Sequence, residues 1–154
     1  MPTSTLIQFL GEGAGTDTSA RRQVATFIAA EAIAANDAVS LDLAQAIDGD
    51  KSLKVMKTDT GTATDKCFVG IALEGAAAGA RIDVCIAGIC EANVAGTTAA
   101  GSVLQIGSTA GRLDVRTTAV NEGGAATFNL FPVCGIAAEA DTANVATIFV
   151  FKQF

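Results

Sequence analysis

The sequence predicts an all-β fold: a small β-barrel or sandwich, built from a duplicated β-motif and preceded by a flexible N-terminal arm. Three observations predict it. Short segments rich in β-branched and apolar residues follow one another along the chain. Turn residues, mainly Gly, Asn and Asp, separate them at intervals of roughly 8–15 residues, a spacing typical of sandwiches and barrels. A short segment of the first half also returns in the second half.

The expected strands are short and differ in pattern. Leu53–Lys57 and Arg81–Ile86 alternate between apolar and polar residues, as a strand with one buried face does. Cys67–Leu73 is almost continuously apolar, which is typical of a strand buried on both faces. The expected strands are Val24–Ile28, Ala38–Leu41, Leu53–Lys57, Cys67–Leu73, Arg81–Ile86, Val103–Ile106, Arg112–Arg116, Thr127–Val133 and Ala146–Phe151.

The segment Ser19–Asn36 admits two interpretations. It is rich in Ala, the best helix former, and a helix would place Val24 and Phe27 on the same face as Glu31. A charged residue on that face would interrupt the apolar stripe that a packed helix needs. We therefore expect a strand, a turn and a second strand here, with a short helix as the alternative.

The two halves of the chain resemble each other. Gly70–Glu74, with the sequence GIALE, returns as Gly135–Glu139, with the sequence GIAAE. The supporting matches are Ala35–Val39 with Ala99–Val103, and Leu53–Val55 with Leu113–Val115. These matches predict two copies of one motif, at about residues 34–90 and 98–154. Because Gly is unfavourable in a strand, Gly70 and Gly135 predict bulges or a close approach of the backbone.

Residues 1–23 differ from the rest and are expected to form an extended arm, with residues 24–154 as the barrel domain. The apolar run Leu6–Leu10 is followed by the glycine-rich segment Gly11–Gly15 and the polar stretch Thr16–Ser19. Such a composition keeps a segment flexible. The glycines are a poor dinucleotide fingerprint, because Thr16 stands where its third glycine belongs and no clear βαβ unit follows.

Composition excludes several classes of function. The 154 residues include no His, Trp or Tyr. Without His there is no imidazole base and no His ligand for zinc or haem. Ten Lys and Arg against sixteen Asp and Glu give a net charge of −6, which disfavours nucleic-acid binding. No apolar stretch reaches the roughly 20 residues of a membrane span, and no signal peptide is evident. We expect no nucleic-acid or membrane partner and a protein made in a cytoplasm.

The cysteines and carboxylates predict structure more than chemistry. The cysteines are Cys67, Cys85, Cys90 and Cys134. They form no C-x-x-C pair of the kind found in zinc sites, and most lie in apolar runs, so we expect reduced, core-packing thiols. A disulfide between Cys85 and Cys90 across a turn at Gly88 is conceivable, but a reducing compartment opposes it.

Two carboxylate pairs are candidates for acid–base work. They are Glu74 with Glu139, and Asp48 with Asp50. Neither pair has the aromatic or basic surroundings of a catalytic pocket, so we expect solvated loop ends. The sequence therefore predicts no catalytic residue, no metal ligand and no cofactor. A small enzyme that uses its cysteines or carboxylates is the least favoured interpretation.

Three segments resemble the capsid decoration proteins of tailed bacteriophages, also called cement or head-stabilising proteins. They are Ala34–Asp42, Phe68–Gly79 and Cys134–Glu139, and the resemblance covers about residues 24–154. It implies a small β-barrel that binds the outer surface of an icosahedral capsid and clamps neighbouring subunits of the major capsid protein. It also implies a homo-oligomer, a trimer more readily than a dimer, with no catalysis and no cofactor. Such a protein is part of the virion and is assembled in the host cytoplasm.

The resemblance gives the arm a role in capsid binding. The expected contact residues are Leu6, Ile7, Phe9 and Leu10 as apolar anchors, with Arg21 and Arg22 for charge pairing. The two arginines are the only cluster of positive charge, and they can instead serve solubility alone. The alternative function is another virion β module, either a fibre base or a carbohydrate-binding domain.

Overall fold

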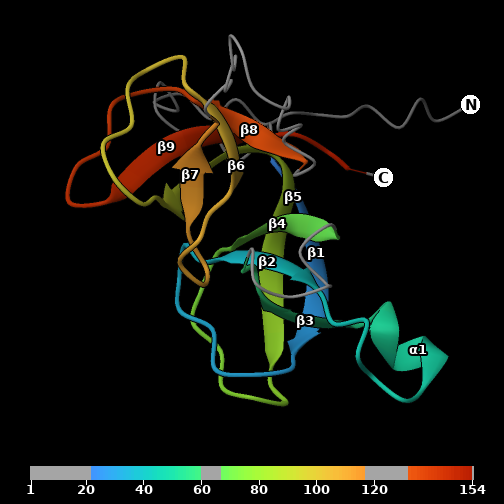
Figure 1. Ribbon diagram of the computed structural model, residues 1–154. Helices are drawn as coiled ribbons and strands as arrows, with labels where there is room; N and C mark the ends of the chain where they lie inside the picture. Colours follow the sequence, from blue (N-terminus) through green and yellow to red (C-terminus); the bar gives the residue numbers. More distant parts are fainter. Residues whose placement is uncertain (1–21, 60–66, 117–131, 154) are drawn as a thin grey trace, which may run out of the picture.

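The computed structural model describes residues 22–59, 67–116 and 132–153. They form β-strands with one short helix, which confirms the all-β prediction (Figure 1). The strands are β1 (Gln23–Ala29), β2 (Ala38–Leu41), β3 (Lys54–Lys57), β4 (Phe68–Ala72), β5 (Arg81–Asn93), β6 (Val103–Ile106), β7 (Leu113–Val115), β8 (Val133–Ala137) and β9 (Val145–Val150), and the helix α1 spans Asp48–Lys51. Among these residues, no helix has the length and apolar character needed to cross a membrane.

The first half of the chain forms a closed barrel of five strands, which we call the first barrel. Its strand order is β1-β3-β2-β4-β5, and pairing between β1 and β5 closes it. β1 and β3 run parallel, whereas the other neighbours are antiparallel. Alternate side chains point inward, as the pleat of a strand requires. They form a buried core of Ala29, Ile33, Val39, Val55, Val69, Ala72, Ile82 and Val84.

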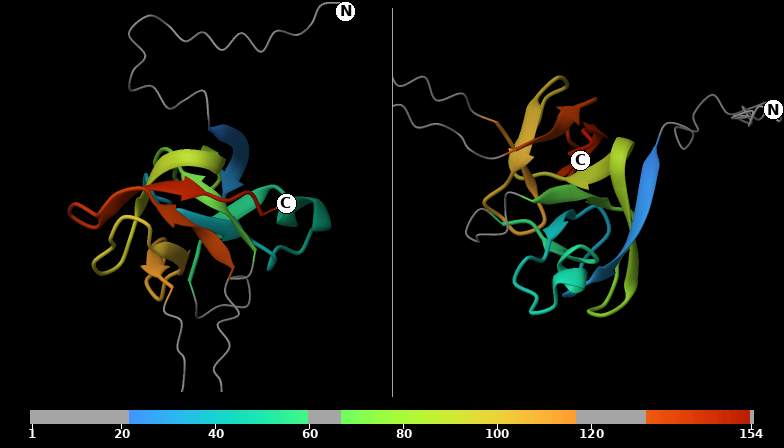
Figure 2. Two further views of the ribbon diagram at one scale, coloured as in Figure 1. Left: turned by 90° about the horizontal axis from the view of Figure 1, so that it is seen from above. Right: turned by 90° about the vertical axis from the view of Figure 1, so that its right-hand side faces the viewer.

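Strand β5 is long because it belongs to both halves of the molecule. Its first part pairs with β1 and β4, and its second part, from Gly88 to Asn93, pairs with β9. The strand order then continues β9-β8-β6-β7. A parallel bridge between Val94 and Leu113 brings β7 back to the end of β5. We call this group the second barrel. The right-hand view of Figure 2 shows the two halves one above the other, with β5 running along both.

The strand pairings confirm that the motif is duplicated. Val39 faces Gly70 in the first barrel, and Leu104 faces Gly135 in the second. In both barrels the register shifts directly after this pair, so each glycine stands beside a β-bulge. A Cβ atom at either glycine would collide with a backbone carbonyl of the neighbouring strand. Both expectations for these glycines, the bulge and the close approach, are therefore confirmed.

The alignment of the two copies by sequence was wrong by one residue at β2. The pairings match Val39 with Leu104, which is 65 positions later, and not with Val103. The same offset relates Gly70 to Gly135. The offset of 65 positions also relates β1 to the second half of β5. Each structural copy therefore begins earlier in the chain than the segments that the sequence matched. Short runs of Ala and Gly fit at several offsets, and this explains the slip.

A larger slip affects β3, because the first copy carries an insertion. Leu41 pairs with Val55 in the first barrel as Ile106 pairs with Leu113 in the second. Fourteen positions separate the first pair and seven the second. The additional residues hold α1, where the sequence predicted only a turn. Val55 therefore matches Leu113, and not Val115 as the sequence suggested.

Other elements follow the prediction with two exceptions. Ser19–Asn36 contains the strand β1 and no helix among its described residues. Gly88 was expected in a turn, but β5 continues through it with φ of 99°, so this glycine bends the strand without reversing it. Most of the predicted strand Thr127–Val133 lies outside the described residues, and β8 begins at its last residue.

Candidate functional site

The predicted capsid-binding residues fall almost entirely outside the described part of the chain. Those that lie outside it are Leu6, Ile7, Phe9, Leu10 and Arg21. Arg22 is described and directly precedes β1. Arg22 lies at the junction between the two barrels.

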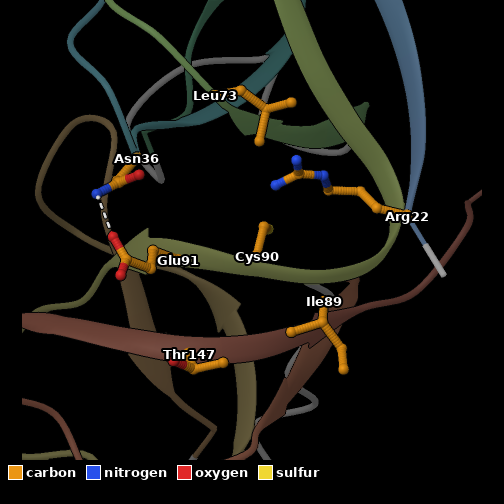
Figure 3. Close-up of a pocket in the computed structure, with 7 residues that line it drawn as sticks. All are labelled: Arg22, Asn36, Leu73, Ile89, Cys90, Glu91 and Thr147. Atoms are coloured by element: carbon orange, nitrogen blue, oxygen red, sulfur yellow. Dashed lines mark hydrogen bonds between the residues drawn. The ribbon is translucent and has the colours of Figure 1, made fainter. Parts of the chain in front are cut away.

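A pocket of about 510 Å³ opens at this junction beside Arg22 (Figure 3). The residues that line it are Arg22, Asn36, Leu73, Ile89, Cys90, Glu91 and Thr147. They come from both barrels: the residue before β1 and the connections before β2 and after β4 on one side, and β5 and β9 on the other. The lining combines an apolar part with one cation and one carboxylate, which suits a polypeptide segment better than a purely apolar ligand.

The bend in β5 shapes the floor of the pocket. The adjacent residues Gln23 and Val24 of β1 pair with Ala87 and Cys85 of β5. The pairing thus skips one residue of β5, which marks a bulge in that strand. The positive φ of Gly88 completes the change of direction, and glycine adopts this conformation without a steric penalty. In Figure 3, Cys90 points from β5 into the pocket and Arg22 extends toward it from the end of β1.

Asn36 forms the opposite end of the pocket. Its φ of 68° lies in the left-handed region, which Asn tolerates better than most residues. Its side-chain amide donates a hydrogen bond to Glu91 Oε2 at 3.5 Å (Figure 3). Arg22 and Glu91 therefore stand at different ends of one pocket, so a ligand there meets positive charge at one end and negative charge at the other.

Polar contacts to the next residue, Asp37, fix the two barrels against each other. Asn93 of β5 donates its backbone N–H to the carbonyl of Asn36 at 2.8 Å. Its side-chain amide donates to Asp37 Oδ1 at 2.9 Å, and the N–H of Ala34 donates to Asp37 Oδ2 at 2.9 Å. Asp37 is buried, so these bonds replace the water that its carboxylate loses. In the sequence, Asn36 and Asp37 indicate only a turn, and no local pattern marks Asn93.

Gly111 makes a second junction contact from the connection between β6 and β7. Its N–H donates to the carbonyl of Thr58, and its carbonyl accepts from the N–H of Ala38, both at 2.8 Å. Its φ is 76°, and a Cβ atom would lie 2.8 Å from Asp37 Cγ. The close fit explains why glycine stands here, and in the sequence Gly111 indicates only a turn.

One thiol, Cys90, lines the pocket, and a second thiol, Cys85, lies buried next to it. Cys85 and Cys90 are both buried and free, and their side chains form a hydrogen bond. This bond lowers the pKa of Cys85, and the nearby charge of Arg22 lowers it further against the opposing effect of burial. The same bond, together with burial, raises the pKa of Cys90.

The remaining candidate residues are placed as the sequence predicted. Cys134 is a buried, free thiol in the core of the second barrel, and burial raises its pKa to about 12. Cys67 is half-buried. Glu74 and Glu139 are exposed, and Asp48 forms an ion pair with Lys51 at the surface. Within the described residues, no group of three or more metal-ligating side chains could hold an ion.

Comparison with known proteins reveals a likeness of fold. No family matches the sequence, and no curated protein matches it either. Among solved structures, the chain is similar to the N base of the head fiber gp8.5 of bacteriophage phi29. The TM-score is 0.55 at 14% sequence identity, and the match covers 85% of this chain and 95% of that one. Coverage of this extent spans both barrels, so the likeness concerns the duplicated architecture as a whole.

Proposed function

We propose that this chain is a structural protein of a phage virion that associates with the outside of the head. The observation that carries this proposal is the fold shared with a head-fiber base over 85% of the chain. The resemblance of Ala34–Asp42 and Phe68–Gly79 to phage decoration proteins supports it independently. On this proposal the protein is not an enzyme, and it acts through buried contact area shared among many weak contacts.

Two finer functions compete. As a decoration protein, the chain clamps neighbouring major capsid protein subunits and stabilises the shell. As a fibre base, it occupies the head surface and carries a further structure without stabilising the shell. The resemblance in sequence favours the clamp, and the solved neighbour favours the base. A carbohydrate-binding domain is less favoured, because sugar sites usually use aromatic platforms and the chain has no Trp or Tyr.

In both cases we assign the contact with the head to the arm and the junction pocket. The arm joins the barrels at Arg22, beside a pocket with Glu91 at its other end. A guanidinium in this position can pair with a carboxylate of the major capsid protein. The apolar residues Leu6, Ile7, Phe9 and Leu10 supply anchors that can bury area on the shell.

The decisive experiment uses purified, expanded heads that lack this protein, prepared from the phage whose genome encodes it. Full-length protein is titrated onto the heads, and bound copies are counted after sedimentation. The full-length variant with Leu6→Asp and Phe9→Asp should lose binding, whereas Ala77→Asp on an exposed loop should bind normally. Far-UV circular dichroism shows that each variant is folded. Failure of the wild-type protein to bind such heads refutes the proposed function.

The same heads distinguish the two finer functions. A clamp raises the temperature at which heads release their DNA, because it holds subunits together across their boundaries. A fibre base saturates its sites and leaves that temperature unchanged. Saturable binding on a glycan array, without binding to heads, would instead favour the carbohydrate-binding alternative.

A further inference from the structure

The two barrels share one fold but have different surroundings. A face that is buried in one barrel is therefore exposed in the other. The outer face of the first barrel carries the apolar residues Ala38, Phe68, Ile71 and Cys85. None of them is more than 1% exposed, because they pack into one continuous core with the interior of the second barrel. We call this set the covered face. The first barrel thus forms a lid over one side of the second.

The register of the strands identifies the same positions on the second barrel. Ala38 pairs with Ile71 as Val103 pairs with Ile136, and Ile71 pairs with Cys85 as Ile136 pairs with Phe149. The equivalent set is Val103, Val133, Ile136 and Phe149, which we call the trailing face. Here nothing among the described residues acts as a lid: Val103 is 37% exposed and Phe149 is 43% exposed. The face is apolar at every position, although it meets solvent.

The opposite difference in burial appears on the side of the second barrel that the first barrel covers, and on the equivalent side of the first barrel. Ala92 and Ile106, inside the second barrel, are fully buried beneath the first. The equivalent residues of the first barrel, Phe27 and Leu41, are only half-buried. Beside them, Leu53 is 52% exposed. We call Phe27, Leu41 and Leu53 the leading face.

We propose that the trailing face of one copy packs against the leading face of a second copy, head to tail. This repeats between chains the packing that already joins the two barrels within one chain. In repeat proteins a terminal unit leaves exposed the face that its neighbour would cover, and a second chain can take the place of that neighbour. The contact joins two different surfaces, so it builds closed rings or open chains, and not a symmetric pair. It rests on the proposed function as a virion protein and on the homo-oligomer that the resemblance to decoration proteins implies, and it specifies the surfaces.

One polar contact of the junction cannot recur between chains. Within the chain, the N–H of Asn93 donates to the turn carbonyl of Asn36. The residue equivalent to Asn93 is Ile28, whose N–H already donates to the carbonyl of Leu53 at 2.9 Å. The contact between chains therefore depends on apolar packing, and charged substitutions on either face should abolish it.

The test measures molar mass by size-exclusion chromatography with light scattering, in the absence of heads. The trailing-face variant carries Val103→Asp and Phe149→Asp, and the leading-face variant carries Leu41→Asp and Leu53→Asp. A control variant adds the same charge on exposed loops, with Ala77→Asp and Thr142→Asp. We expect wild type and control to have a mass of several chains, and each face variant to have the mass of one chain. Circular dichroism confirms that the variants keep their β-structure.

A mixture of the two face variants gives the sharpest result. Each variant keeps one intact face, so an equimolar mixture should form a complex of two chains and nothing larger. A mixture that stays at the mass of one chain would overturn the head-to-tail arrangement, as would wild type at that mass. Loss of assembly in the full-length variant with Leu6→Asp and Phe9→Asp would assign the faces to the arm and also overturn it. Head binding is measured separately, so a negative result here leaves the proposed function standing.

Discussion

The two strand glycines offer the strictest test of how the duplicated barrels are built. At Gly70, an added Cβ would lie 2.9 Å from the carbonyl carbon of Cys85 and 2.9 Å from a side-chain methyl of Val84. At Gly135 it would lie 3.1 Å from the carbonyl carbon of Phe149. In each case it would approach the carbonyl oxygen more closely still, below the 3.0 Å that real Cβ atoms keep. We predict that alanine at either position is strongly destabilising.

The magnitude follows from what must move. The added Cβ collides with the backbone of a central strand, so the clash is removed only if two paired strands separate near a bulge. Overpacking a core usually costs about 1–3 kcal/mol, and a clash with backbone belongs above that range, at about 3–5 kcal/mol. Domains of this size are stable by only about 5–15 kcal/mol, so the loss is a large part of the total.

Chemical denaturation followed by circular dichroism measures this effect, since the chain has no Trp or Tyr for fluorescence. The matched control is Gly49→Ala in α1, where an added Cβ meets nothing within 4 Å. Because Ala favours a helix over Gly, the control should be neutral or more stable by up to about 1 kcal/mol. If Gly70→Ala and Gly135→Ala unfold within about 1 kcal/mol of wild type, the close strand approach is not a feature of this protein.

Three further predictions concern the buried polar groups. Burial raises the pKa of Cys134 to about 12, so its stabilising contribution is complete below the ordinary thiol pKa and is lost progressively as the pH rises from that value to about 12. Wild type should lose about 1.4 kcal/mol per pH unit in the alkaline range relative to Cys134→Val, and equal pH profiles in urea denaturation would contradict this. Asp37→Ala and Asn93→Ala should each lower the free energy of unfolding by about 1–3 kcal/mol, and a double-mutant cycle should show a coupling of at least about 0.5 kcal/mol. Strictly additive effects would contradict the hydrogen bond between the two side chains. Cys90→Ala should raise the pKa of Cys85 more than Arg22→Ala does, as measured by thiolate absorbance against pH, and the reverse order would refute the thiol hydrogen bond as the main cause.

The sequence predicts the strands well because their signals are local. Alternation of apolar and polar residues gave Leu53–Lys57 and Arg81–Ile86, and the structure has strands at both. The bulge or close approach at Gly70 and Gly135 was predictable from the sequence alone, because a glycine inside an apolar strand needs a steric reason. The duplication itself was also evident, since its best marker falls on a strand that must pair in the same way in both copies.

The features that depend on tertiary structure were not predictable in this way. A glycine with positive φ fits a turn and a bend equally well, so only the pairing of β5 with β1 and β9 shows that Gly88 bends. The junction joins Asp37 to Asn93, which are 56 positions apart and have no local pattern in common. The pocket beside Arg22 likewise exists only because two barrels share one strand.

The duplication also indicates where function has shaped the chain. Both copies need an apolar interior, so Val39 and Leu104, which occupy equivalent positions, are both apolar and fully buried. The outer positions experience different surroundings, and there the copies diverge. Cys85, buried between the barrels, corresponds to Phe149, which is 43% exposed. Solvent alone would favour a smaller or polar residue at that position, because exposed apolar patches promote association. A large aromatic residue there fits the head-to-tail contact that we propose, in which a second copy covers the trailing face.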